Sequence, residues 1–131
     1  MTLYFRNVTV LLVAMCLVAT WGVVVTAQSA EELRARAEAG NAVAQFNLGF
    51  MYATGRGIPQ NDTEAVRWYR RSAIQSFALA QAGLGHMYFS GRGVPQNDDE
   101  AARWYRRAAE QDYVAGRNNL EEMYAEGRAV P

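Results

Sequence analysis

Apolar residues recur along the chain at helical spacing, in two stripes that each occur twice. The first stripe has intervals of 4, 3 and 1 residues, which place its members on one face of a helix. Its copies are Ala44, Leu48, Met51 and Tyr52, then Ala80, Leu84, Met87 and Tyr88. The second stripe comprises Ala65, Trp68, Tyr69, Ser72 and Ala73, then Ala101, Trp104, Tyr105, Ala108 and Ala109. The pattern therefore predicts a helix A and a helix B in each copy, with the recurring aromatic residues in the core.

The two copies form a sequence repeat with a period of 36 residues. Of the 30 positions in residues 44–73, 21 are identical in residues 80–109, and a partial third copy occupies residues 114–131. Repeats of this length bury their apolar faces by stacking on their neighbours. We therefore predict an all-α fold, an α/α solenoid of antiparallel helix pairs with 36-residue units at 42–77, 78–113 and 114–131.

The ends of the helices follow from glycine, proline and short polar residues. Gly55 and Gly91 suit a left-handed C-terminal position, and a proline four residues after each glycine prevents the helix from resuming. Asn61 or Asp62, like Asn97 or Asp98 in the second copy, supplies the N-terminal cap of helix B. The six expected helices are 30–39, 42–54, 62–75, 78–90, 98–111 and 114–126, and the first is expected to be a half-unit that covers the start of the array.

The third copy departs from the other two at a glycine. Gly49 and Gly85 are expected to let helices A and B of one unit approach closely, and Glu121 stands at the same position in the third copy. Because this copy has no helix B, Glu121 is free to face water. We interpret residues 115–126 as a polar terminal cap; the alternative is a surface that docks another copy or a partner.

The N-terminal segment has the character of an export signal. No charged residue occurs in residues 8–27, Arg6 precedes them, and small residues follow at the end of the run. We predict a signal peptide at residues 1–27, a repeat domain at residues 28–131, and a periplasmic or secreted location. The alternative is an uncleaved membrane anchor at residues 8–27. The only cysteine, Cys16, lies in this segment, so the repeat domain is held by packing alone.

The repeated residues closely resemble the Sel-one-like repeat, a relative of the tetratricopeptide repeat. The first copy carries the pattern at Ala44, Leu48, Gly49, Met51, Tyr52, Gly55, Gly57, Pro59, Ala65, Trp68, Tyr69 and Ala73, and the second copy is complete. The third copy departs from it at Glu121 and Ala129 and lacks helix B. The resemblance covers about residues 37–131. It implies a solenoid that binds proteins or peptides and performs no catalysis.

Partner selection is expected where the repeats differ, because residues that hold the array together recur. On helix A the variable positions lie on one face away from Leu48 and Tyr52, and stacking aligns them in columns. By resemblance to tetratricopeptide arrays this face is concave. An alternative is that the aromatic residues among them pack between units. The candidate partner-binding residues are Phe46, Phe50, Ala82, His86, Phe89, Asn118 and Glu122.

The arginines recur with the repeat and suggest structural roles first. The run Arg67, Arg70, Arg71, Arg103, Arg106 and Arg107 is expected to form a solvated outer face, with a phosphate-binding or acidic-partner patch as the alternative. Arg56, Arg92 and Arg128 follow the glycines that end helix A in each copy. We expect them to cap the last carbonyls of that helix.

Composition removes several functional classes. Acidic and basic residues number 13 each, so no net field favours nucleic acid. Lysine is absent and His86 is the only histidine, so no nucleophile–base pair, metal site or cofactor site is expected. The leading interpretation is an exported, non-catalytic module for binding a protein or peptide. The alternatives are a β-lactam-binding or β-lactam-hydrolysing enzyme, as described for cysteine-rich relatives, and a membrane-anchored envelope regulatory element.

Overall fold

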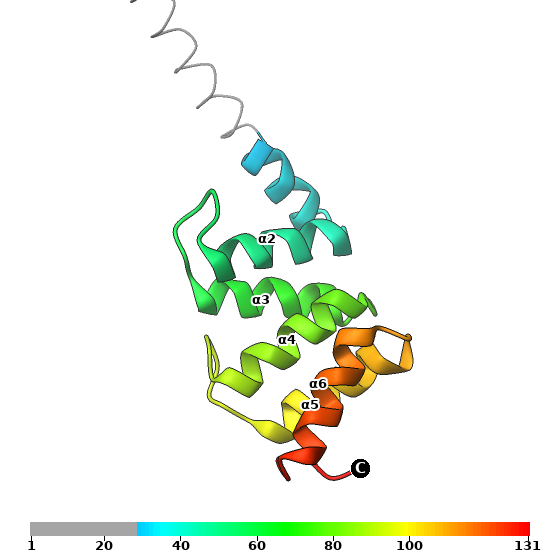
Figure 1. Cartoon of the computed structure of the whole chain (residues 1–131). Helices are drawn as coiled ribbons and strands as arrows, with labels where there is room; N and C mark the ends of the chain where they lie inside the picture. The colour runs from blue at the N-terminus through cyan, green and yellow to red at the C-terminus, as the bar shows by residue number, and fades with distance from the viewer. Residues whose placement is uncertain (1–28) are drawn as a thin grey trace, which may run out of the picture. The chain divides into compact units, whose positions relative to one another are not determined.

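The computed structural model describes residues 29–131, and Leu33–Pro131 form one compact unit (Figure 1). Residues 29–38 are helical, and five further helices follow: α2 (Ala42–Thr54), α3 (Asp62–Ala73), α4 (Ala78–Ser90), α5 (Asp98–Glu110) and α6 (Val114–Ala125). Each helix from α2 to α5 packs on the next one in the chain. The predicted all-α solenoid of 36-residue helix pairs is confirmed, with α2, α4 and α6 as helix A and α3 and α5 as helix B.

The expected signal peptide or anchor at residues 1–27 lies outside the described residues. None of the described helices combines the length and the apolar character that crossing a membrane requires.

The helix boundaries agree with the predicted ones to within two residues. Gly55 and Gly91 take the left-handed conformation, with φ of 69° and 68°, and their N–H groups donate to the carbonyls of Met51 and Met87. Of the two residue types considered for the helix B cap, asparagine is the one used. The Oδ1 atom of Asn61 accepts from the N–H of Glu64 at 3.1 Å, and Asn97 repeats this bond. The aspartates that follow the caps are therefore left for another role.

The repeated aromatic residues form the core, as predicted. Trp68, Tyr69, Trp104 and Tyr105 are each at most 9% exposed. Burial raises the pKa of Tyr69 and of Tyr105 to about 12. Such side chains are the main source of apolar burial in a small array, which here stands without a disulfide in the described part.

The glycines of helix A allow a close approach of helix B, as expected. A Cβ atom at Gly49 would lie 2.7 Å from the Tyr69 ring, and one at Gly85 would lie 2.9 Å from the Tyr105 ring. Glu121, at the same position of the third copy, is exposed. Glycine is therefore required on helix A where a tyrosine ring of helix B packs against it. The third copy has no helix B, so this requirement does not apply there.

Residues 33–38 cover the first face of the array, as predicted for a half-unit. Ala37 is fully buried in a cluster with Ala44, Leu48 and Trp68, and Leu33 packs against the same cluster. The buried amide of Gln45 donates to the Ala37 carbonyl at 3.0 Å. This segment therefore takes the place that helix B takes in the complete units.

Candidate functional site

One column of variable helix A residues is exposed in all three units. Phe50 on α2, His86 on α4 and Glu122 on α6 stand at the same repeat position, and each side chain reaches solvent. Asn118, at a neighbouring repeat position on α6, is exposed as well. We call Phe50, His86 and Glu122 the helix A column. All three side chains of this column are therefore accessible from solvent.

Three of the candidate residues are covered, contrary to the expectation of an exposed face. The ring of Phe46 stacks on Tyr69, with ring centroids 5.7 Å apart, and meets the edge of Phe77 at 5.5 Å. Ala82 is only 9% exposed, and Phe89 is half-buried with the Arg128 guanidinium 3.7 Å from its ring centroid. Phe89 packs between units, because Arg128 belongs to the next unit, whereas the ring contacts of Phe46 lie within its own unit. A helical pattern shows which face a residue occupies but not how far the next helix covers it.

Phe50 is the exposed edge of an otherwise buried aromatic cluster. Its side chain is 40% exposed, and its ring centroid lies 6.4 Å from that of Phe46. The guanidinium of Arg56 lies 5.7 Å from the Phe50 ring. Phe50 is a large apolar ring that packs on Phe46 and has the Arg56 cation beside it. Such a ring is suited to anchor a partner side chain.

Arg92 and Arg128 join consecutive units, which the sequence analysis did not foresee. Arg92 donates to both carboxylate oxygens of Asp62, at 3.1 and 2.6 Å, and to the carbonyl of Ala53 at 2.7 Å. Arg128 contacts Asp98 and the Phe89 carbonyl in the same way. We call each arrangement an interunit clamp.

The predicted capping role of Arg92 and Arg128 was wrong about which helix is capped. The carbonyls they cap belong to helix A of the preceding unit and not to their own helix. The hydrogen bond from Arg92 holds the pKa of Asp62 below its usual range, and Arg128 does the same for Asp98. A signal was present in the sequence, because aspartate and arginine recur together with a separation of 30 residues. Arg56, the first copy, has no such aspartate among the described residues, and its guanidinium lies beside Phe50 instead.

The arginine run on helix B forms an outer face, but part of it also bridges units. Arg67 and Arg103 pair with the glutamates three residues earlier, at 3.3 and 2.8 Å, as expected. Arg70 and Arg106, however, donate to the hydroxyl groups of tyrosines on the next helix A, at 2.7 and 3.1 Å. The face thus combines solvated ion pairs with contacts that hold neighbouring helices.

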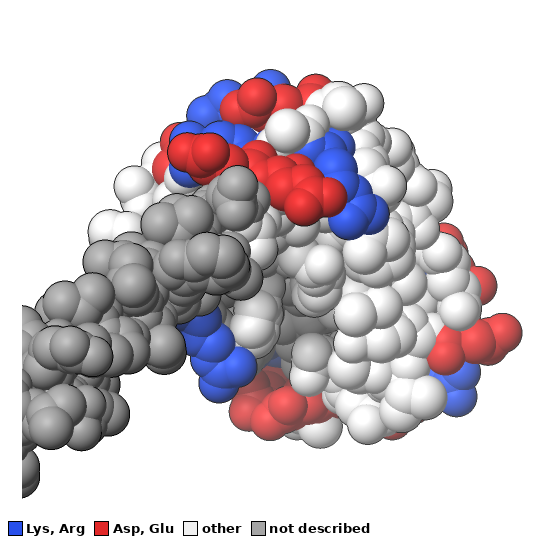
Figure 2. Space-filling view, turned by 90° about the horizontal axis from the view of Figure 1, so that it is seen from above, with Lys and Arg blue, Asp and Glu red and all other residues white. Residues whose placement is uncertain are grey.

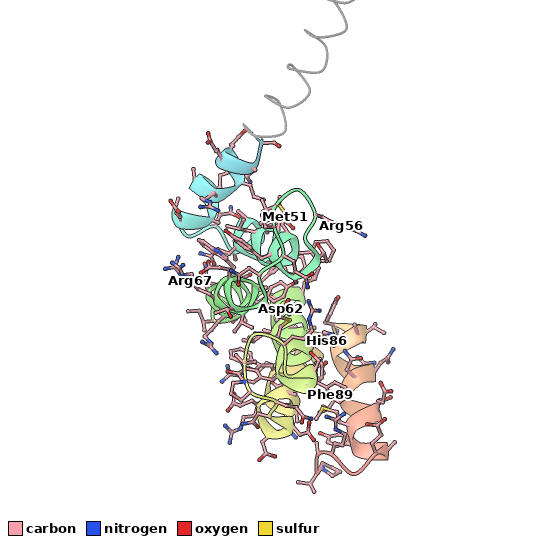
Figure 3. All side chains as sticks on the ribbon, turned by 90° about the vertical axis from the view of Figure 1, so that its left-hand side faces the viewer. Met51, Arg56, Asp62, Arg67, His86 and Phe89 are labelled. Atoms are coloured by element: carbon pink, nitrogen blue, oxygen red, sulfur yellow. The ribbon has the colours of Figure 1, made fainter. Side chains whose placement is uncertain are left out.

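Charges of both signs lie next to each other on the surface. On the face shown in Figure 2, arginines and acidic residues lie side by side at the top, at the bottom and at the right-hand rim, and uncharged residues cover the surface between them. In Figure 3, Arg67 points to one side of the ribbon and His86 and Arg56 lie toward the other. The described residues contain no group of three or more His, Cys, Asp or Glu side chains that could hold a metal ion.

Comparisons with known proteins identify the repeat. The Sel1 repeat model matches residues 42–77 and 78–113. A protective antigen of uropathogenic Escherichia coli that displays an SLR fold is 37% identical, with a TM-score of 0.76. A Sel1 repeat protein from Oxalobacter formigenes is 40% identical, with a TM-score of 0.72. Each structure matches 78% of this chain, which spans 22% of the antigen and 42% of the Oxalobacter protein. No curated protein matches the chain.

Proposed function

The chain belongs to the Sel1 repeat family, and we propose that its helix A column binds a segment of a partner protein. Sel1 repeats generally mediate protein–protein interactions and act as scaffolds. The observation that carries the proposal is the exposure of Phe50. A phenylalanine with this much solvent contact, at a position that is histidine and glutamate in the other units, is not required by the stack.

The charges along helix A favour an orientation for the bound segment. At the α2 end, Phe50 is flanked by Arg56, whereas α6 exposes Glu121 and Glu122. His86 lies between them on α4. A segment with an apolar residue and a carboxylate toward α2, and a basic residue toward α6, is complementary to this surface. Recognition then depends on shape and one aromatic anchor, with no chemical step.

The proposal is tested by truncating the anchor. Phe50→Ala is expected to weaken partner capture by roughly thirtyfold, which corresponds to an anchor worth about 2 kcal/mol. Val130→Ala is the matched control, because it truncates an exposed apolar residue away from the column. A photo-crosslinker at His86 identifies the partner from envelope extract, and calorimetry with the purified partner measures both variants. Equal affinities for the wild type and Phe50→Ala would contradict the proposal.

We also propose that the module is exported. The support is the uncharged segment at residues 8–27 with a preceding arginine. The mature chain is then expected to begin near Gln28 and to be released by osmotic shock. Mass spectrometry of the N-terminus decides between this and the alternatives. An intact chain in the membrane fraction would favour the anchor, and an intact chain in the cytoplasmic fraction would reject export altogether.

A further inference from the structure

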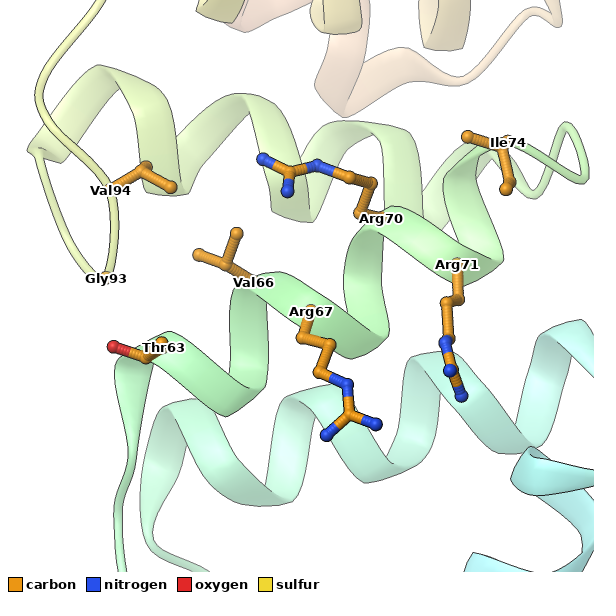
Figure 4. Close-up of a pocket in the computed structure, with 8 residues that line it drawn as sticks. All are labelled: Thr63, Val66, Arg67, Arg70, Arg71, Ile74, Gly93 and Val94. Carbon is orange, nitrogen blue, oxygen red and sulfur yellow. The ribbon is translucent and has the colours of Figure 1, made fainter.

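A depression of about 430 Å³ lies on the outer side of α3, where the loop of the next unit comes over it (Figure 4). Helix α3 supplies most of its lining, and Gly93 and Val94 of the following loop close one end. None of these residues belongs to the helix A column. The lining residues are Thr63, Val66, Arg67, Arg70, Arg71, Ile74, Gly93 and Val94. We call this depression the α3 groove.

The α3 groove combines aliphatic surface with cationic surface. Val66 is buried and Val94 is half-buried, while Ile74 is 68% exposed. Arg67 and Arg70 lie beside them, and no carboxylate is among the lining residues. Such a surface attracts a ligand that carries both apolar groups and negative charge.

The arginines keep donors available for a ligand. Arg67 uses one terminal nitrogen for Glu64, and Arg70 uses one for the hydroxyl of Tyr88. The Arg71 guanidinium lies 5.0 Å from the Trp68 ring. A guanidinium has five N–H donors, so these contacts leave several unused. Their present partners also hold the guanidinium groups in place, which lowers the entropy lost on binding.

The next repeat provides an internal comparison. At the positions equivalent to Thr63, Val66 and Ile74, helix α5 carries Asp99, Ala102 and Glu110. The arginines are the same in both units, so α5 presents two additional carboxylates and less apolar surface. Glu110 is exposed like Ile74, which shows that folding does not require isoleucine at this position. The difference between the units therefore indicates a role for the α3 groove other than stacking.

We infer that the α3 groove binds an acidic, aliphatic segment of a partner protein. Carboxylates of the segment pair with Arg67, Arg70 and Arg71, and aliphatic side chains of the segment pack on Ile74 at one end of the groove and on Val94 at the other. From Thr63 to Ile74 the stripe runs for about 16 Å at 1.5 Å per residue. About five residues of an extended segment cover this length. The inference adds a second surface to the proposed helix A site and does not depend on it.

The test uses a defined probe and matched variants of the full repeat domain. The probe is a fluorescent peptide of alternating glutamate and leucine, and its control has glutamine in place of glutamate. Ile74→Glu, which introduces the residue found at position 110, is expected to weaken binding by about tenfold or more through lost apolar contact and charge repulsion. Arg67→Gln is expected to weaken it by about two- to fivefold. Arg103→Gln, which removes the equivalent arginine and its equivalent ion pair from α5, is expected to have no effect.

Fluorescence anisotropy at two salt concentrations gives the affinities. Circular dichroism of each variant checks that it is folded. Ile74→Glu is expected to fold normally because Ile74 is exposed. The inference would be overturned if the glutamine peptide bound as tightly as the glutamate peptide. It would also be overturned if Arg67→Gln and Arg103→Gln weakened peptide binding equally.

Two other outcomes would identify a different occupant of the groove. Ile74-dependent binding to phosphatidylglycerol vesicles without peptide binding would identify a membrane contact instead. Ile74-dependent self-association in sedimentation would identify a second copy as the occupant. A Phe50→Ala variant that still binds the peptide separates this site from the helix A column.

Discussion

Replacing Gly93 with alanine is expected to destabilise the array more than the same change at Gly57, its counterpart in the preceding unit. Both residues have positive φ, 69° at Gly93 and 76° at Gly57, so the backbone alone costs about 1 to 2 kcal/mol at either position. Their surroundings differ. A Cβ atom at Gly57 would meet only the terminal methyl group of Met51, at 3.2 Å, and that group can move. A Cβ atom at Gly93 would overlap the backbone carbonyl of Asp62 and lie 2.9 Å from the Thr63 nitrogen.

The size of the expected destabilisation follows from the contact between the added Cβ atom and the backbone of α3. Unlike the Met51 side chain, this backbone cannot move aside by a side-chain rotation. Overpacking adds about 1 to 3 kcal/mol, so Gly93→Ala should cost about 2 to 5 kcal/mol in total and Gly57→Ala about 1 to 2 kcal/mol. Urea denaturation followed by circular dichroism measures both, with the slope m expected to be unchanged. Equal midpoints for the two variants would refute the reasoning, because they would show that the loop at Gly93 is not seated on the start of α3.

Three further predictions concern charge and the core. Because its arginine partner lowers the pKa of Asp62 from 3.8, the clamp stabilises the folded state fully at neutral pH, and this stabilisation is lost as the pH falls below about 4. Asp62→Asn should therefore narrow the difference between urea midpoints at pH 7 and pH 3, and an unchanged difference would argue against the clamp. Trp104→Ala should cost about 3 to 5 kcal/mol, whereas Arg107→Ala, which removes a cation near that ring, should cost less than about 1 kcal/mol; similar midpoints would contradict the core assignment. Tyr69 and Tyr105 should ionise only near pH 12 in an ultraviolet titration, and ionisation near pH 10 would show that they are not buried as described.

The repeat made the helices and their core faces predictable. A stripe that occurs twice in register identifies the buried side of each helix with little ambiguity, and glycine marks where helix A ends. The end of α3 was placed two residues too late because no glycine marks it. Ser76 takes a left-handed conformation there, with φ of 64°, and Asp112 does the same after α5, with φ of 60°. Neither residue type signals a helix end as clearly as glycine does.

The surface was less predictable than the core. Whether Phe46 is exposed depends on the ring of Tyr69 on α3 and on Phe77, which immediately precedes α4. The sequence pattern of one helix contains no information on such coverage. The same limit applies to the clamps: the recurrence of Asp62 and Arg92 was visible, but their contact arises only when units stack. The sequence thus located the variable column, and the structure reduced it to the residues that solvent reaches.

The interunit clamp has a consequence for the length of the array. The unit 78–113 contributes Arg92, which reaches the preceding unit, and Asp98, which Arg128 reaches from the following unit, so the junction is heterologous and joins head to tail. Nothing in such a junction limits the number of copies. Inserting a second copy of residues 78–113 would pair the new Arg92 with Asp98, and Arg128 with the new Asp98. The unit can therefore be duplicated during evolution or in design without altering a single contact residue, and each added unit brings another helix A and its variable positions.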